Sequence, residues 1–82
     1  MALFFNEAKI KTALNTMQEN EREQYVNGFI DILGMPGNTK QGNKNLDTAF
    51  MNLGTAITMA YSMSLKQEET QNVKNYLAKI GI

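Results

Sequence analysis

The chain has 82 residues, in which eight basic side chains balance eight acidic ones, so its formal net charge is zero. A chain of this length forms a single domain, residues 1–82, that buries only about 60–65% of its unfolded surface. Because it contains no Cys and no His, disulfides and the usual zinc, haem and iron–sulfur sites are excluded, and no metal or cofactor is expected. We therefore expect close helix packing and self-association to stabilise it.

The distribution of charged and apolar residues excludes two kinds of partner. The lysines are scattered along the chain, whereas a protein that binds duplex nucleic acid normally shows a basic stripe. No apolar run approaches the ~18 residues of a membrane-spanning helix. Residues 1–5 are apolar, but they lack the basic start and the length of a signal peptide. We expect a cytoplasmic protein, in the host cell cytoplasm if a phage encodes it.

Two amphipathic helices are predicted in the first half of the chain. Asn6 can cap a helix over residues 6–18, where apolar side chains recur at helical spacing. Asn20 begins a variant of the capping box and predicts a second helix over residues 20–34. Gly34 can end that helix in the left-handed conformation that glycine accepts at low cost.

Two further helices are predicted in the second half. Asn45 can cap a helix over residues 45–63, whose apolar positions recur at steps of four and three. The S-x-x-Q sequence at Ser64 predicts a last helix over residues 65–80. Gly28 would permit a close crossing between helices. The fold class is therefore all-α, a small four-helix bundle or two helical hairpins, with the central helix packed against the other three.

A loop of residues 34–44 is the candidate ligand site. It is rich in Gly and Asn, holds the only Pro, and is expected to lack regular structure. Its glycines would let backbone N–H groups face an anion, and its lysines would neutralise a phosphate. The alternative is a solvated connection that only reverses the chain. The candidate ligand-binding residues are Asn38, Thr39, Lys40 and Lys44, together with Tyr61, whose ring can stack on a ligand.

The central helix also offers a candidate oligomer interface. Its apolar residues lie on more than one side, which is typical of a buried helix. Met51 and Met63 lie off its main stripe, whereas Met17 and Met59 are interpreted as fillers of the core. The interface is predicted to comprise Phe50, Met51, Gly54, Thr58 and Met63, with Thr55 nearby.

Nothing in the sequence predicts catalysis. The chain has no His or Cys to act as base or nucleophile. Its adjacent carboxylates lie where helices begin, and the helix dipole already explains acids at such positions. Residues 37–40 include a lysine but lack the G-K-[ST] order of a phosphate-binding loop. We therefore expect that the protein is not an enzyme.

Residues 46–57, L-D-T-A-F-M-N-L-G-T-A-I, resemble the L-x-x-G-F-M-x-L-x-R-A-I helix of small phage proteins that sequester the cyclic-nucleotide messengers of anti-phage defence. The resemblance implies a helical, non-catalytic, oligomeric protein with nucleotides bound between subunits. It covers about a dozen residues. Ala49 stands at the family's Gly position and Thr55 at its Arg position, so phosphate recognition by that arginine is not carried over.

These observations favour a non-catalytic binding protein, an anti-defence protein that sequesters a cyclic nucleotide or blocks a host protein. The abundance of Asn and Lys is typical of low-GC bacterial or phage genomes. One alternative is a structural or scaffolding module that only self-assembles. Another is a helical protein like the bacteriocin immunity proteins, which rests on fold analogy alone.

Overall fold

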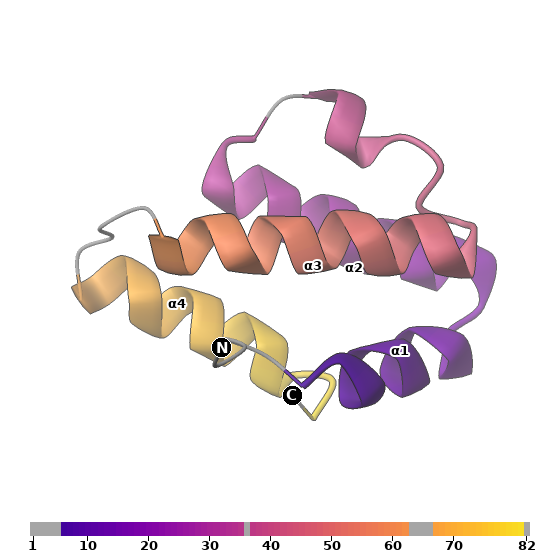
Figure 1. The fold of residues 1–82 in the computed structure, drawn as a ribbon, viewed down its shortest axis with the longest axis horizontal. Helices are drawn as coiled ribbons and strands as arrows, with labels where there is room; N and C mark the ends of the chain where they lie inside the picture. The colour runs from indigo at the N-terminus through magenta and orange to yellow at the C-terminus, as the bar shows by residue number, and fades with distance from the viewer. Residues whose placement is uncertain (1–5, 36, 63–66, 82) are drawn as a thin grey trace.

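The computed structural model describes residues 6–35, 37–62 and 67–81. This part of the chain forms four α-helices and no strand: α1 (Glu7–Thr16), α2 (Glu19–Leu33), α3 (Leu46–Ser62) and α4 (Gln67–Ala78) (Figure 1). A short 3₁₀ helix, η1 (Gly37–Lys40), lies between α2 and α3. The predicted all-α fold is confirmed. No helix within the described residues is both long and apolar enough to cross a bilayer.

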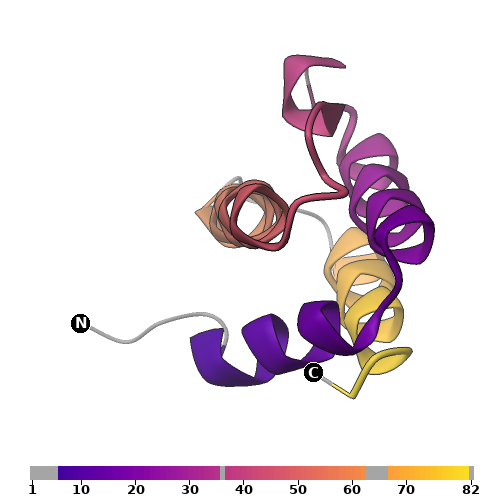
Figure 2. The same ribbon diagram turned by 90° about the vertical axis from the view of Figure 1, so that its right-hand side faces the viewer.

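The helix α3 is the centre of the packing, because it contacts each of the other three α-helices. Figure 2 looks nearly along α3; α1 passes crosswise beneath it, and α2 and α4 lie to its right. Among the described residues, the buried core between these helices is aliphatic apart from the ring of Phe29. Its buried members are Ile10, Leu14, Val26, Phe29, Ile30, Ala49, Leu53, Ala56, Ile57, Ala60, Val73 and Leu77.

Three of the predicted helix ends are confirmed. The side-chain oxygen of Asn6 accepts a hydrogen bond from the backbone N–H of Lys9 at 3.1 Å. Asn45 caps α3 in the same way, accepting from the N–H of Thr48 at 3.1 Å. Gly34 ends α2 with φ of 66°, in the left-handed region. The capping sequence predicted at residue 64 lies outside the described residues.

The junction between α1 and α2 differs from the prediction. Helix α1 ends at Thr16, whereas the prediction ended it at residue 18. The N-cap of α2 is Gln18 and not the predicted Asn20, and the side chain of Gln18 makes no capping hydrogen bond. The buried side chain of Arg22 makes hydrogen bonds at this junction. Its Nε donates to the carbonyl of Leu14 at 2.9 Å and its Nη2 to the carbonyl of Met17 at 3.1 Å.

Arg22 also reaches the chain that enters α3, because its Nη1 donates to the backbone carbonyl of Lys44. Three backbone carbonyls therefore accept hydrogen bonds from this buried cation. Two of them belong to the C-terminal end of α1, where the helix dipole favours positive charge. Arg22 thus joins α1, α2 and the start of α3 at a single point.

Helix α4 is held to α2 by two tyrosines. The hydroxyl of Tyr25 donates to the carbonyl of Tyr76 at 3.2 Å, and the hydroxyl of Tyr76 donates to the carbonyl of Tyr25 at 2.9 Å. The ring centroids lie 4.9 Å apart. Burial raises the pKa of both phenols, and for Tyr76 the charge of Asp31 contributes further. Both hydroxyls are therefore protonated donors at neutral pH.

The predicted close crossing at Gly28 lies at this same contact. A Cβ atom on Gly28 would stand 2.5 Å from the hydroxyl oxygen of Tyr76. Gly28→Ala is expected to lower the free energy of unfolding by about 1–2 kcal/mol, because overpacking and a disturbed hydrogen bond outweigh the ~1 kcal/mol gain in helix propensity. Tyr76→Phe removes the obstructing oxygen, so urea unfolding should show the double variant to be more stable than Gly28→Ala alone. A double variant as unstable as the sum of the two single ones would contradict this contact.

Candidate functional site

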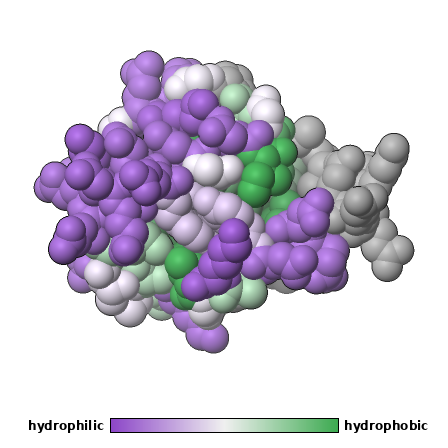
Figure 3. Space-filling view, turned by 180° about the vertical axis from the view of Figure 1, so that it is seen from behind, coloured by the Kyte–Doolittle hydropathy of each residue, from purple (hydrophilic) through white to green (hydrophobic). Residues whose placement is uncertain are grey.

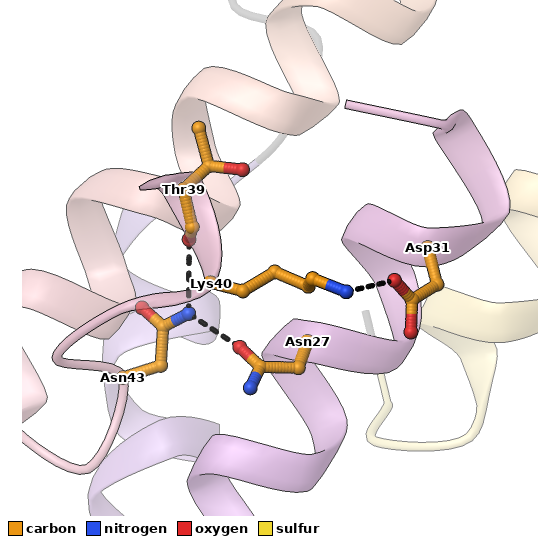
Figure 4. A network of polar contacts seen from close by, with 5 residues as sticks. All are labelled: Asn27, Asp31, Thr39, Lys40 and Asn43. Atoms are coloured by element: carbon orange, nitrogen blue, oxygen red, sulfur yellow. Dashed lines mark hydrogen bonds and ion pairs between the residues drawn. The ribbon is translucent and has the colours of Figure 1, made fainter. Parts of the chain in front are cut away.

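The loop between α2 and α3 is fastened by a network of side-chain amides (Figure 4). Asn43 is fully buried. Its amide nitrogen donates to Oδ1 of Asn27 at 2.7 Å and to the carbonyl of Thr39 at 3.0 Å. Its own Oδ1 accepts from Nδ2 of Asn52, on α3, at 2.8 Å. Since amide hydrogen bonds satisfy both ends of Asn43, the loop is closed around it and joined to two helices.

The expectation that residues 34–44 lack regular structure is therefore wrong in part, since η1 forms within them. The buried amide explains the difference. The 3₁₀ turn over residues 37–40 places the carbonyl of Thr39 where it accepts a hydrogen bond from the buried amide of Asn43. Within the described residues, no buried side-chain nitrogen or oxygen lacks a hydrogen-bond partner.

The predicted ligand-binding residues do not form one cluster in the structure. Asn38, Thr39 and Lys40 share η1, but Nζ of Lys40 lies 2.6 Å from a carboxylate oxygen of Asp31 on α2 (Figure 4). The positive charge of Lys40 is thus already offset. Lys44 is exposed, and its carbonyl is bound by Arg22. Tyr61 belongs to α3, but its side chain lies outside the described part of the structure.

Most of the residues predicted to form an oligomer interface line a hollow on the surface of α3. This hollow has a volume of about 360 Å³ and is lined by Phe50, Met51, Gly54, Thr55, Thr58 and Met59. Four of the five predicted interface residues are among them, and the fifth, Met63, lies outside the described residues. We call this set of six residues the α3 face.

Met59 was interpreted as a core filler, and this is wrong. Its side chain is 39% exposed and lines the α3 face, whereas Met51 is 68% exposed. The signal that could have placed it is its spacing, because Met51, Thr55 and Met59 follow one another at steps of four and so lie along one line of the helix. Met17, the other predicted filler, is half-buried and packs against the core as expected.

The α3 face is electrically neutral. Asp47 is the only charged residue of α3, and its carboxylate lies 4.0 Å from the ammonium group of Lys11. Lys11 also lies 5.8 Å from the ring centroid of Phe50, so charge is confined to one end of the face. The face itself offers thioethers, one aromatic ring and two hydroxyls, which suit burial against an apolar surface.

The described residues contain no group of three side chains that could hold a metal ion. Comparisons of this chain with protein-family models, with curated proteins and with solved structures find no match in any of the three.

Proposed function

We propose that this protein is a non-catalytic binding module that works through the α3 face and forms homo-oligomers there. The observation that carries the proposal is the exposure of Met51, 68%, beside an apolar hollow on the helix around which the core is built. Covering this thioether with another surface would contribute favourable free energy, because apolar area would be removed from water.

The position of this surface supports the proposal further. From residue 48 to residue 62 the chain has no charged side chain, although the whole protein is 20% charged. The opposite side of the molecule, seen in Figure 3, is mostly hydrophilic and shows only small apolar areas. A clustered apolar surface on one side of a small protein is typical of an interaction site.

Light scattering over a range of protein concentrations tests the proposal. The wild-type mass is expected to rise above that of a monomer, and Met51→Glu is expected to return it to the monomer, because a buried carboxylate opposes association. Ile32→Glu is the matched control, since Ile32 is an apolar side chain 49% exposed on α2. A wild-type protein that is monomeric at every concentration, or a mass that falls equally in both variants, would overturn the proposal.

Capture of a cyclic nucleotide between subunits stays a prediction from the resemblance of residues 46–57. Titration calorimetry with cyclic di- and trinucleotides tests it, and absence of heat across the panel would end it. If heat is seen, the variant with Lys40→Ala and Lys44→Ala shows whether the loop is responsible. Loss of heat in that variant would assign the nucleotide to the loop, whereas unchanged heat would place it elsewhere.

A further inference from the structure

We infer that Asn27 is a site of spontaneous deamidation, and that the folded chain suppresses the reaction by holding Asn27 in a helix and bonding its side chain to the buried amide of Asn43. The sequence supplies the reactive pair, because Asn27 is the only asparagine that precedes a glycine. Glycine favours the reaction, since a residue without Cβ leaves its backbone nitrogen open to approach the asparagine side chain. Asn27 lies on α2 and is not part of the α3 face, so its deamidation would proceed with or without a partner on that face.

The reaction needs only the chain itself and water. The backbone nitrogen of Gly28 attacks Cγ of Asn27 and loses its proton, and the new C–N bond closes a five-membered succinimide ring. The bond from Cγ to Nδ2 breaks, and Nδ2 leaves with that proton as ammonia. Water then adds to either carbonyl of the ring and opens it. The product is an aspartate at position 27 or an isoaspartate, in which the backbone runs through the former side chain.

The fold has a packing reason to keep each residue of this reactive pair. Oδ1 of Asn27 accepts a hydrogen bond from Nδ2 of Asn43 at 2.7 Å (Figure 4), which attaches the loop to α2. Gly28 admits the hydroxyl of Tyr76, because a Cβ atom there would stand 2.5 Å from that oxygen. The same two neighbouring residues therefore serve contacts with the loop and with α4, and their order along the chain creates the reactive sequence.

Two features of the folded state oppose the reaction. Residues 27 and 28 lie in the interior of α2, where each backbone N–H donates to the carbonyl four residues earlier. The ring cannot close while residue 27 keeps helical dihedral angles. The bond from Asn43 also fixes the side chain of Asn27, and breaking it leaves the fully buried Asn43 short of a partner. Deamidation thus requires local unwinding of α2 together with release of the loop.

The product would change α2 permanently. An aspartate at position 27 would stand one helical turn before Asp31, and like charges at this spacing destabilise a helix. An isoaspartate adds a methylene group to the backbone and interrupts the helix. Because ammonia is lost to the solvent, the conversion runs in one direction. The converted fraction would therefore record how long α2 has spent open.

Incubation of the full chain at mildly alkaline pH, followed by digestion and mass spectrometry, tests this site. In guanidinium chloride, where the chain is unfolded, residue 27 is expected to be converted faster than any other asparagine. Gly28→Ala in the same denaturant is expected to remove this preference, because its methyl group obstructs the backbone nitrogen. In buffer, the folded wild type should convert residue 27 at least about tenfold more slowly than the unfolded chain, since only the open fraction reacts.

Asn43→Ala tests whether the side-chain bond contributes to the protection. With its helical content checked by circular dichroism, this variant should convert residue 27 in buffer about tenfold faster than the wild type, because opening no longer breaks that bond. In guanidinium chloride the two proteins should react at the same rate. The matched control is Asn38→Ala, an exposed position in the same loop, which should react at the wild-type rate in buffer.

A measurement on the wild type alone completes the test. Low concentrations of guanidinium chloride should accelerate the conversion of residue 27 and the hydrogen exchange of the Gly28 amide in parallel, because one opening exposes both. Faster reaction of another asparagine in the unfolded chain would overturn the site, and equal rates in folded and unfolded wild type would overturn the protection. A folded Asn43→Ala that reacts at the wild-type rate would overturn the role of the amide bond. If that variant is unfolded, conversion that does not follow the exchange of the Gly28 amide overturns the inference, and conversion that follows it supports the inference.

Discussion

Replacing Arg22 by Met is expected to lower the free energy of unfolding by about 3–4 kcal/mol, because three backbone carbonyls lose a charged donor while the side-chain volume is nearly kept. Hydrogen bonds to charged groups contribute about 1.5–3 kcal/mol each, and partial rehydration of the carbonyls reduces their sum. A domain of this size has a total stability of roughly 4–12 kcal/mol. The variant should therefore lose between about a quarter and all of this stability.

Urea unfolding followed by circular dichroism measures this effect. Arg22→Lys should show an intermediate loss, since one ammonium group cannot reach all three carbonyls at once. Lys44→Ala is the control, because it removes an exposed side chain and keeps the carbonyl that Arg22 binds; its stability should stay within about 0.5 kcal/mol of the wild type. Equal losses in Arg22→Met and Lys44→Ala would show that the guanidinium does not hold the helices together.

Replacing Asn43 by Ala is expected to cost about 2–3 kcal/mol. Asn43 is fully buried, and its loss removes bonds to Asn27, to Asn52 and to the carbonyl of Thr39. Their partners are only half-buried, so water can replace part of what is lost. The amides of residues 39–43 should also exchange with solvent faster, because the loop loses its attachment to α2 and α3.

The control for this experiment is Asn38→Ala, which changes an exposed asparagine in the same loop. Its thermal and urea unfolding should match those of the wild type within about 0.5 kcal/mol. If both variants lose the same stability, the cost would come from the composition of the loop and not from the buried amide network.

Local features of this fold could be predicted from the sequence, whereas most hydrogen bonds between distant residues could not. Asn6 and Asn45 were recognised as caps because each bonds to a backbone N–H three residues along the chain. Gly34 was recognised as a helix end because its conformation is a property of the residue itself. The bonds of Arg22 and Asn43 reach 22 and 16 residues along the chain, to Lys44 and Asn27, and depend on how the helices dock.

The candidate sites follow the same division. Most of the α3 face could be predicted, because helical spacing places its residues on one side of the helix. Met59 was assigned to the core because apolar residues lie on most sides of α3. The loop was a candidate anion site, with a solvated connection as the alternative, because it combines glycines with two lysines and no acid, and one of those lysines is Lys40. Its acidic partner, Asp31, lies nine residues earlier on a different helix, and only the folded chain brings the two together.

The position of Arg22 has a consequence for how the molecule opens. Its three hydrogen bonds join the end of α1, the body of α2 and the segment that leads into α3. If any of these segments unfolded alone, the buried guanidinium would lose hydrogen-bond partners. The three segments should act as a single cooperative unit. Among the described contacts, Arg22 makes none with α4, which is held through the paired tyrosines and its contact with α3. Sub-global unfolding should therefore begin with the release of α4, before the rest of the fold is lost.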